Sequence, residues 1–202
     1  MGSSFLEKDC LKYIDIISII LIVLIISYIC YRLTFYSTRN IENNKTVKLP
    51  DDFIFKTYKD LIVQDIEDVK KYNYTSLSIK SFDGLTLHAR YYEYQKGAPI
   101  ELMFHGYKGN STRDMSSGVK RAFRCGRNAI LVDQRASGES EGHVITFGIK
   151  ERLDCLSWVN YVIETFGSNI KIILTGVSMG AATVMNASSM DLPLAYIFGF
   201  PI

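Results

Sequence analysis

The sequence has few of the residues that build disulfide frameworks, metal sites or nucleic-acid surfaces. It contains only 4 cysteines and 3 histidines in 202 residues, with no CxxC pair, no HExxH motif and no Cys/His cluster. We therefore expect no metal site, no cofactor and no disulfide scaffold, and we interpret the cysteines as free, mostly buried thiols. Lysine and arginine number 23 against 21 acidic residues and form no long basic block, which argues against a nucleic-acid partner.

Composition indicates a folded chain, since 48% of the residues are hydrophobic and 22% are charged. These values exclude disorder and, with this length, predict one domain or at most two. The expected parts are a tail at 1–12, a transmembrane helix at 13–31, a tether at 32–50, an amphipathic helix at 51–73 and an incomplete α/β domain at 74–202.

The segment at 13–31 is the longest apolar run. Residues 16–31 carry no charge, and together with Tyr13 and Ile14 they approach the roughly 20 residues needed to cross a bilayer core. A buried core helix would show a polar face, and a cleaved signal peptide would be followed by a small-residue site; neither feature is present. We expect a single-pass anchor in the lipid bilayer. More lysine and arginine follow it than precede it, which favours a cytoplasmic C-terminal part by a small margin, so the side of the membrane stays open.

The region between this helix and residue 74 has two characters. Residues 37–50 are rich in Asn, Thr and charge and end in Pro50, as in an exposed tether. In 51–73 apolar residues recur at spacings of three and four, which predicts an amphipathic helix. That helix could pack on the following domain or lie on the membrane surface, and the mixed charge of its polar face favours packing.

From residue 74 onward the pattern alternates between strands and helices. A hairpin is expected around the turn Asp83-Gly84. Further strands are predicted at 100–105, 129–133, 170–176 and 194–200, with helices at 112–126, 149–166 and 179–190. This alternation predicts a mostly parallel sheet covered by helices on both faces, with the functional site at the carboxyl ends of its strands.

The motif GVSMG at 176–180 lies between a predicted strand and an Ala-containing helix, which is the context of a nucleophile elbow. Such a turn holds Ser178 in a strained conformation, and only small residues, here Gly176 and Gly180, let strand and helix approach closely. The serine also lies at a helix N-terminus, where the backbone N–H of Met179 could donate to an oxyanion.

Two further loops follow predicted strands. In HGYKGN the backbone N–H of Tyr107, after Gly106, is the candidate for the second oxyanion donor. His105 could act as a catalytic base or could bind loop backbone, and its place on the strand favours the structural role. In DQRASGESEG, Asp133 and Arg135 could tie loops together or clamp a substrate; the structural role is again favoured.

These motifs, HGYKGN, DQRASGESEG with ITFG after it, and GVSMGAATV, resemble the α/β-hydrolase superfamily. Within it, the sequence resembles membrane-anchored bacterial hydrolases of serine aminopeptidase or esterase type, peptidase S33-like and related to the Bem46-like group. The likeness covers 74–202, with Ser137 where the family typically has His. It implies an α/β-hydrolase domain in which Ser178 is the nucleophile and the amides of Tyr107 and Met179 form the oxyanion hole. The small acyl, ester, thioester, amide or peptide substrate would react through a covalent ester.

The family order places an acid and then a histidine after the serine. Only 24 residues follow Ser178, with no histidine and the single carboxylate Asp191. We therefore expect a C-terminally truncated domain that lacks acid and base and is inactive as written, with 194–200 as an open sheet edge exposed to a partner or to aggregation. The alternative function is a non-catalytic membrane-anchored binding subunit or a truncated pseudoenzyme, which the fold alone does not separate from a hydrolase.

Overall fold

The computed structural model of the chain describes residues 3–38, 57–193 and 197–201 and divides into two compact units, 1–36 and 37–202. In the first unit, helix α1 runs from Ser3 to Thr34. Its segment Lys12–Thr34 is long and apolar enough to cross a membrane. Most of the predicted tether, 39–50, lies outside the described residues.

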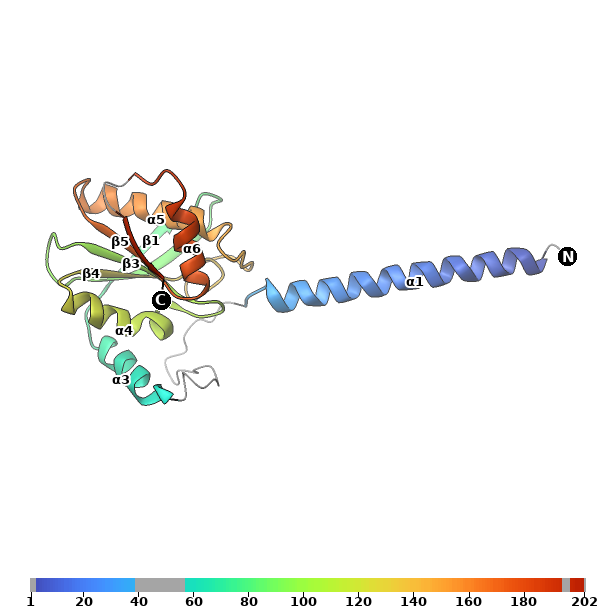
Figure 1. The fold of residues 1–202 in the computed structure, drawn as a ribbon, viewed down its shortest axis with the longest axis horizontal. Helices are drawn as coiled ribbons and strands as arrows, with labels where there is room; N and C mark the ends of the chain where they lie inside the picture. Colours follow the sequence, from blue (N-terminus) through green and yellow to red (C-terminus); the bar gives the residue numbers. More distant parts are fainter. Residues whose placement is uncertain (1–2, 39–56, 194–196, 202) are drawn as a thin grey trace. The chain divides into compact units, whose positions relative to one another are not determined.

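The second unit is built on one sheet (Figure 1). Within the described residues its strands are β1 (Thr75–Lys80), β2 (Thr86–Tyr92), β3 (Ile100–Phe104), β4 (Asn128–Val132), β5 (Ile172–Gly176) and β6 (Ile197–Pro201). Their order is β1-β2-β4-β3-β5-β6. The β1–β2 hairpin joins β4 in antiparallel pairing, and β4, β3, β5 and β6 run parallel. The prediction of a mostly parallel sheet with an opening hairpin is confirmed; 194–196 of the last predicted strand lie outside the described residues.

Helices cover both faces of this sheet (Figure 1). Helices α5 (Glu151–Phe166) and α6 (Met179–Ser188) cover one face, where Trp158 joins the larger apolar cluster. Helix α4 (Ser111–Arg124) covers the other face. Neighbouring side chains of a strand point to opposite faces. Accordingly, Leu102 of β3 packs in the first cluster and Met103 in the second, and the central strands are buried throughout.

The amphipathic segment forms helix α3 (Lys59–Val69), while 51–56 lie outside the described residues. Its buried residues pack against α4. At this contact Lys120 donates to Asp65 at 2.6 Å and to Asp68 at 3.1 Å. The structure therefore shows this helix packed on the domain that follows it.

The expectation of mostly buried cysteines is wrong for those that the structure describes. Of the three cysteines whose side chains the structure describes, Cys30 and Cys125 are exposed and Cys155 is buried. Cys30 lies in the apolar segment of α1, whose side chains are exposed, and Cys125 follows the last residue of α4. Burial raises the pKa of Cys155, so this thiol is unreactive.

Candidate active site

The loop between β5 and α6 places Ser178 at the carboxyl edge of the sheet. Its backbone has φ 53° and ψ −115°, a conformation that residues other than glycine rarely adopt. The residue is exposed and directly precedes the first turn of α6. Among the residues that the structure describes, its hydroxyl has no hydrogen-bond partner. An exposed serine at a helix N-terminus is placed to face a substrate carbonyl.

Two glycines permit this turn by the absence of a side chain. A Cβ on Gly180 would lie 2.7 Å from the carbonyl oxygen of His105 and would overlap the backbone of Phe104. A Cβ on Gly176 would lie 2.5 Å from the backbone nitrogen of Ala181. Strand β5, helix α6 and the end of β3 therefore approach one another through backbone atoms, and any larger residue at either position would force them apart.

The loop after β3 forms a tight turn. Gly109 N donates to Gly106 O at 3.1 Å, with Lys108 at φ 49°. The buried His105 ring lies 2.8 Å from Gly106 O through Nδ1, and its Nε2 accepts from Gln134 N at 3.1 Å. These contacts require the tautomer with the proton on Nδ1. Both ring nitrogens bind backbone of two neighbouring loops, so His105 positions the turn.

This turn lies against the serine. A Cβ built on Gly106 would be 3.6 Å from the Cβ of Ser178, and Val177 N donates to Phe104 O at 3.1 Å. The amide of Gly106 donates to Asp114 at 3.2 Å. The next amide along the loop is that of Tyr107. The geometry therefore brings together Ser178, the turn that carries Tyr107 and the first turn of α6.

An aromatic pair lies beside this turn, and sequence analysis did not single it out. The rings of Tyr107 and Phe147 are stacked with centroids 5.2 Å apart. Phe147 has φ 52°, and its loop is held by the buried Glu151, which accepts from Thr146 N at 2.7 Å and Gly148 N at 2.8 Å. Periodicity carries no signal for Phe147, because its position depends on a left-handed backbone and a buried carboxylate.

Asp133, at the end of β4, joins two segments. Its carboxylate accepts from Ser111 N at 3.0 Å and from Glu139 N at 3.1 Å, and the residue is buried. It thus connects the start of α4 with the loop at 133–142. A carboxylate with both oxygens on backbone amides stabilises loop structure.

Arg135 is buried between two carboxylates. It donates to Asp154 at 2.6 and 2.7 Å and to Asp83 at 3.0 and 3.2 Å. Burial raises the pKa of Asp154 to about 6, although Arg135 acts in the opposite direction. The hydrogen bonds from Arg135 lower the pKa of the more exposed Asp83. With its guanidinium bonded on both sides, Arg135 ties the hairpin turn to α5 and is not a substrate clamp.

No catalytic base contacts the serine in the described part of the chain. His105 binds loop backbone, the Nδ1 of His143 lies 3.3 Å from Ser37 O, and His88 is on β2, three strands away from β5 in the sheet. The described residues also contain no group of three or more His, Cys, Asp or Glu that could bind a metal ion.

Comparison with known proteins relates this architecture to hydrolases. No protein-family model matches the chain. Among solved structures, the esterase Pf2001 of Pyrococcus furiosus has a TM-score of 0.56 and 25% identity over 62% of this chain and 51% of its own. The α/β-hydrolase GrgF of Penicillium sp. has a TM-score of 0.56 and 20% identity over 64% of this chain and 46% of its own.

A cold-adapted esterase from an Arctic intertidal metagenomic library has a TM-score of 0.51 and 16% identity over 62% of this chain and 59% of its own. The chain spans about half the length of the solved structures that it matches. Its described second unit has the fold of the α/β-hydrolases, as the mixed sheet with helices on both faces also indicates.

Proposed function

We propose that this protein is a serine hydrolase of the membrane-anchored, Bem46-like and peptidase S33-like type, with Ser178 as its nucleophile. The observation that carries the proposal is the strained, exposed Ser178 between β5 and α6, against the turn that carries Tyr107. The substrate would be an ester, thioester, amide or peptide, and the Tyr107–Phe147 pair would line one side of its binding site.

In the proposed mechanism the Ser178 hydroxyl oxygen attacks the acyl carbon, and its proton passes to a base. Negative charge develops on the carbonyl oxygen, where the backbone N–H groups of Tyr107 and Met179 would donate hydrogen bonds. One such donor typically contributes about 10²- to 10³-fold in rate. The leaving group departs with a proton, and water then hydrolyses the acyl-serine, which restores the hydroxyl.

The base and the acid are the parts of this mechanism that the described residues do not supply. We therefore propose that the 202 residues by themselves turn over substrate very slowly, since an unassisted serine hydroxyl is a weak nucleophile at neutral pH. In the described residues the Ser178 hydroxyl has no hydrogen-bond partner. This observation favours the alternative function, a non-catalytic membrane-anchored binding subunit or pseudoenzyme.

Labelling with a fluorophosphonate separates these two functions. If the protein acts as a serine hydrolase, the native protein, extracted from its own membranes in detergent, should be covalently phosphonylated at Ser178, which peptide mass spectrometry locates. Ser178→Ala should abolish the label, and Ser189→Ala, an exposed serine beyond the same helix, should leave it unchanged. Unlabelled Ser178 in membranes whose other serine hydrolases react would favour the binding subunit.

We propose that residues 13–31 anchor the protein in the bilayer as a single span. Support comes from the apolar segment Lys12–Thr34 of α1, since about 20 apolar residues cross a bilayer core. The full chain should stay in the membrane pellet after an alkaline carbonate wash, whereas a variant lacking residues 1–36 should be released to the supernatant. Release of the full chain by the same wash would contradict the anchor.

A further inference from the structure

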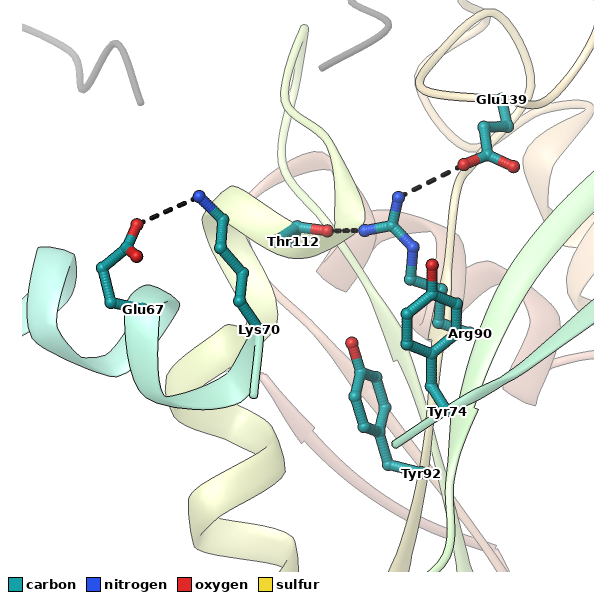
Figure 2. A pocket seen from close by; sticks show the side chains of 7 residues that line it. All are labelled: Glu67, Lys70, Tyr74, Arg90, Tyr92, Thr112 and Glu139. Atoms are coloured by element: carbon teal, nitrogen blue, oxygen red, sulfur yellow. Dashed lines mark hydrogen bonds and ion pairs between the residues drawn. The ribbon is translucent and has the colours of Figure 1, made fainter. Parts of the chain in front are cut away.

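A cavity lies on the face of the sheet that α3 and α4 cover, and Ser178 is not among its lining residues. Its volume is about 520 Å³, within the usual range for small-molecule sites. Figure 2 shows its lining: Glu67 of α3, Lys70 directly after that helix, Tyr74 before β1, Arg90 and Tyr92 of β2, Thr112 of α4 and Glu139. Two strands, β4 and β3, separate β2, which carries Arg90, from β5, which leads to Ser178.

In this cavity the positively charged side chains are less exposed than the negatively charged ones. The cationic side chains are the less accessible ones, with Arg90 20% and Lys70 32% exposed. Their partners are at the rim, with Glu139 51% and Glu67 57% exposed, at 3.3 and 3.0 Å. Exposed ion pairs of this kind contribute little to stability, so a ligand anion would replace the glutamates at small cost.

Arg90 presents its guanidinium in a fixed orientation. One terminal nitrogen donates to the hydroxyl of Thr112 and the other points to Glu139, while the group lies 5.5 Å from the ring centroid of Tyr74 (Figure 2). Burial alone would lower the pKa of Arg90, but the nearby Asp133 and other groups raise it above its usual value, so the charge persists. A planar guanidinium held in this way suits two-point binding of a carboxylate or phosphate.

Two aromatic rings complete the site. Tyr74 and Tyr92 lie with centroids 5.7 Å apart at an interplanar angle of 43°. Figure 2 shows both rings extending in the same direction, with the hydroxyl of Tyr74 close to Arg90. Tyr92 is buried and Tyr74 is half exposed, so one ring is fixed by packing and the other faces the cavity.

We propose that this cavity is a binding site for an aryl oxyanion, that is, a phosphate or carboxylate carried on a flat ring. The oxyanion would bind Arg90 and Lys70 in place of Glu139 and Glu67, and the ring would pack against Tyr74 and Tyr92. The site is separate from Ser178 and does not depend on the proposed hydrolase activity. Because Arg90 also contacts Thr112 in the first turn of α4, an occupant would touch the helix that follows the Tyr107 turn.

The test is calorimetric titration of the full chain in detergent with phenyl phosphate at low ionic strength. We expect one site, with affinity at least tenfold above that for inorganic phosphate. Lys70→Gln should weaken binding about tenfold, as expected for the loss of one charge-assisted hydrogen bond. Glu139→Gln should strengthen binding, because it removes the competing carboxylate. Glu164→Gln, an exposed change of the same charge on α5, is the matched control and should have no effect.

Absence of phenyl phosphate binding would overturn the proposal, as would binding unaffected by both Lys70→Gln and Glu139→Gln. Equal affinities for phenyl phosphate and inorganic phosphate would overturn the part of the proposal in which the ligand's ring packs against Tyr74 and Tyr92. Ser178→Ala should bind phenyl phosphate with the same affinity as the unmodified protein. Loss of binding in that variant would show that phenyl phosphate binds beside Ser178 and not in the cavity at Arg90, which would also overturn the proposal.

Discussion

Gly180→Ala is expected to cause one of the largest losses of folding stability available from a single methyl group in this chain. The added Cβ would meet the backbone of Phe104 and lie 2.7 Å from His105 O. Strand β3 lies between β4 and β5 and cannot move aside without breaking two ladders. Overpacking typically costs about 1–3 kcal/mol, and a clash with central backbone puts this variant at about 3 kcal/mol or more. Urea unfolding followed by the fluorescence of the single, buried Trp158 measures it.

Gly97→Ala is the comparison variant, because an alanine at Gly97 would be opposed by the backbone conformation and an alanine at Gly180 by steric overlap. Gly97 has φ 76° with nothing within 4 Å of an added Cβ, so alanine there bears only backbone strain, roughly 1 kcal/mol. Gly180 does not have a positive φ, and its effect is steric. Equal midpoints for Gly180→Ala and the unmodified protein would show that the close approach of α6 to β3 is dispensable.

The sheet was predictable because its central strands are short apolar runs that helices cover on both faces. Strands 100–104 and 128–132 are buried at every position. The prediction for the first, 100–105, is one residue too long, and the prediction for the second, 129–133, is shifted by one residue. The missed start of β4 has a physical cause. Asn128 is polar but buried, and its side chain accepts from Tyr94 N at 2.7 Å and Gln95 N at 3.0 Å. A strand predicted from a run of hydrophobic residues does not include a polar residue such as Asn128.

The elbow could be identified from the sequence because its requirements are local. A strand, a serine between glycines and a helix start fall within about ten residues, and each restricts the same turn. The aromatic pair of Tyr107 and Phe147 could not, since its rings come from loops 40 residues apart and meet only after folding. The position of β2 beside β4 is likewise long-range information, because no local pattern states which strand a hairpin joins.

The cavity around Arg90 and Lys70 was beyond sequence analysis for a related reason. Each of its cations has an acidic neighbour in the sequence or in space, so charge patterning indicates only ordinary surface pairs. What distinguishes them is the difference in exposure between the cations and their glutamates, and that difference appears only when α3 packs on α4 beside the hairpin.

Arg135→Ala is expected to destabilise the fold by about 3–5 kcal/mol, because it leaves a buried carboxylate without its partner. Asp154 is only 5% exposed and accepts two hydrogen bonds from Arg135 at 2.6 and 2.7 Å. Asp83 keeps Lys150 at 3.3 Å and more contact with water, so the loss arises mainly at Asp154. Unfolding in urea, followed by Trp158 fluorescence, gives the free energy; Arg124→Ala, an exposed arginine at the end of α4, should change it by less than about 0.5 kcal/mol.

The pH dependence of this loss identifies its source. Burial already raises the pKa of Asp154 to about 6, and removal of Arg135 raises it further. A carboxyl group with a raised pKa in the folded state stabilises the fold at low pH, and that stabilisation is lost as pH rises through the folded value. The deficit of Arg135→Ala should therefore be smaller at about pH 5 than at about pH 8, a range above the titration of Asp83. A pH-independent deficit, or one no larger than that of Arg124→Ala, would show that the unpaired Asp154 is not its cause.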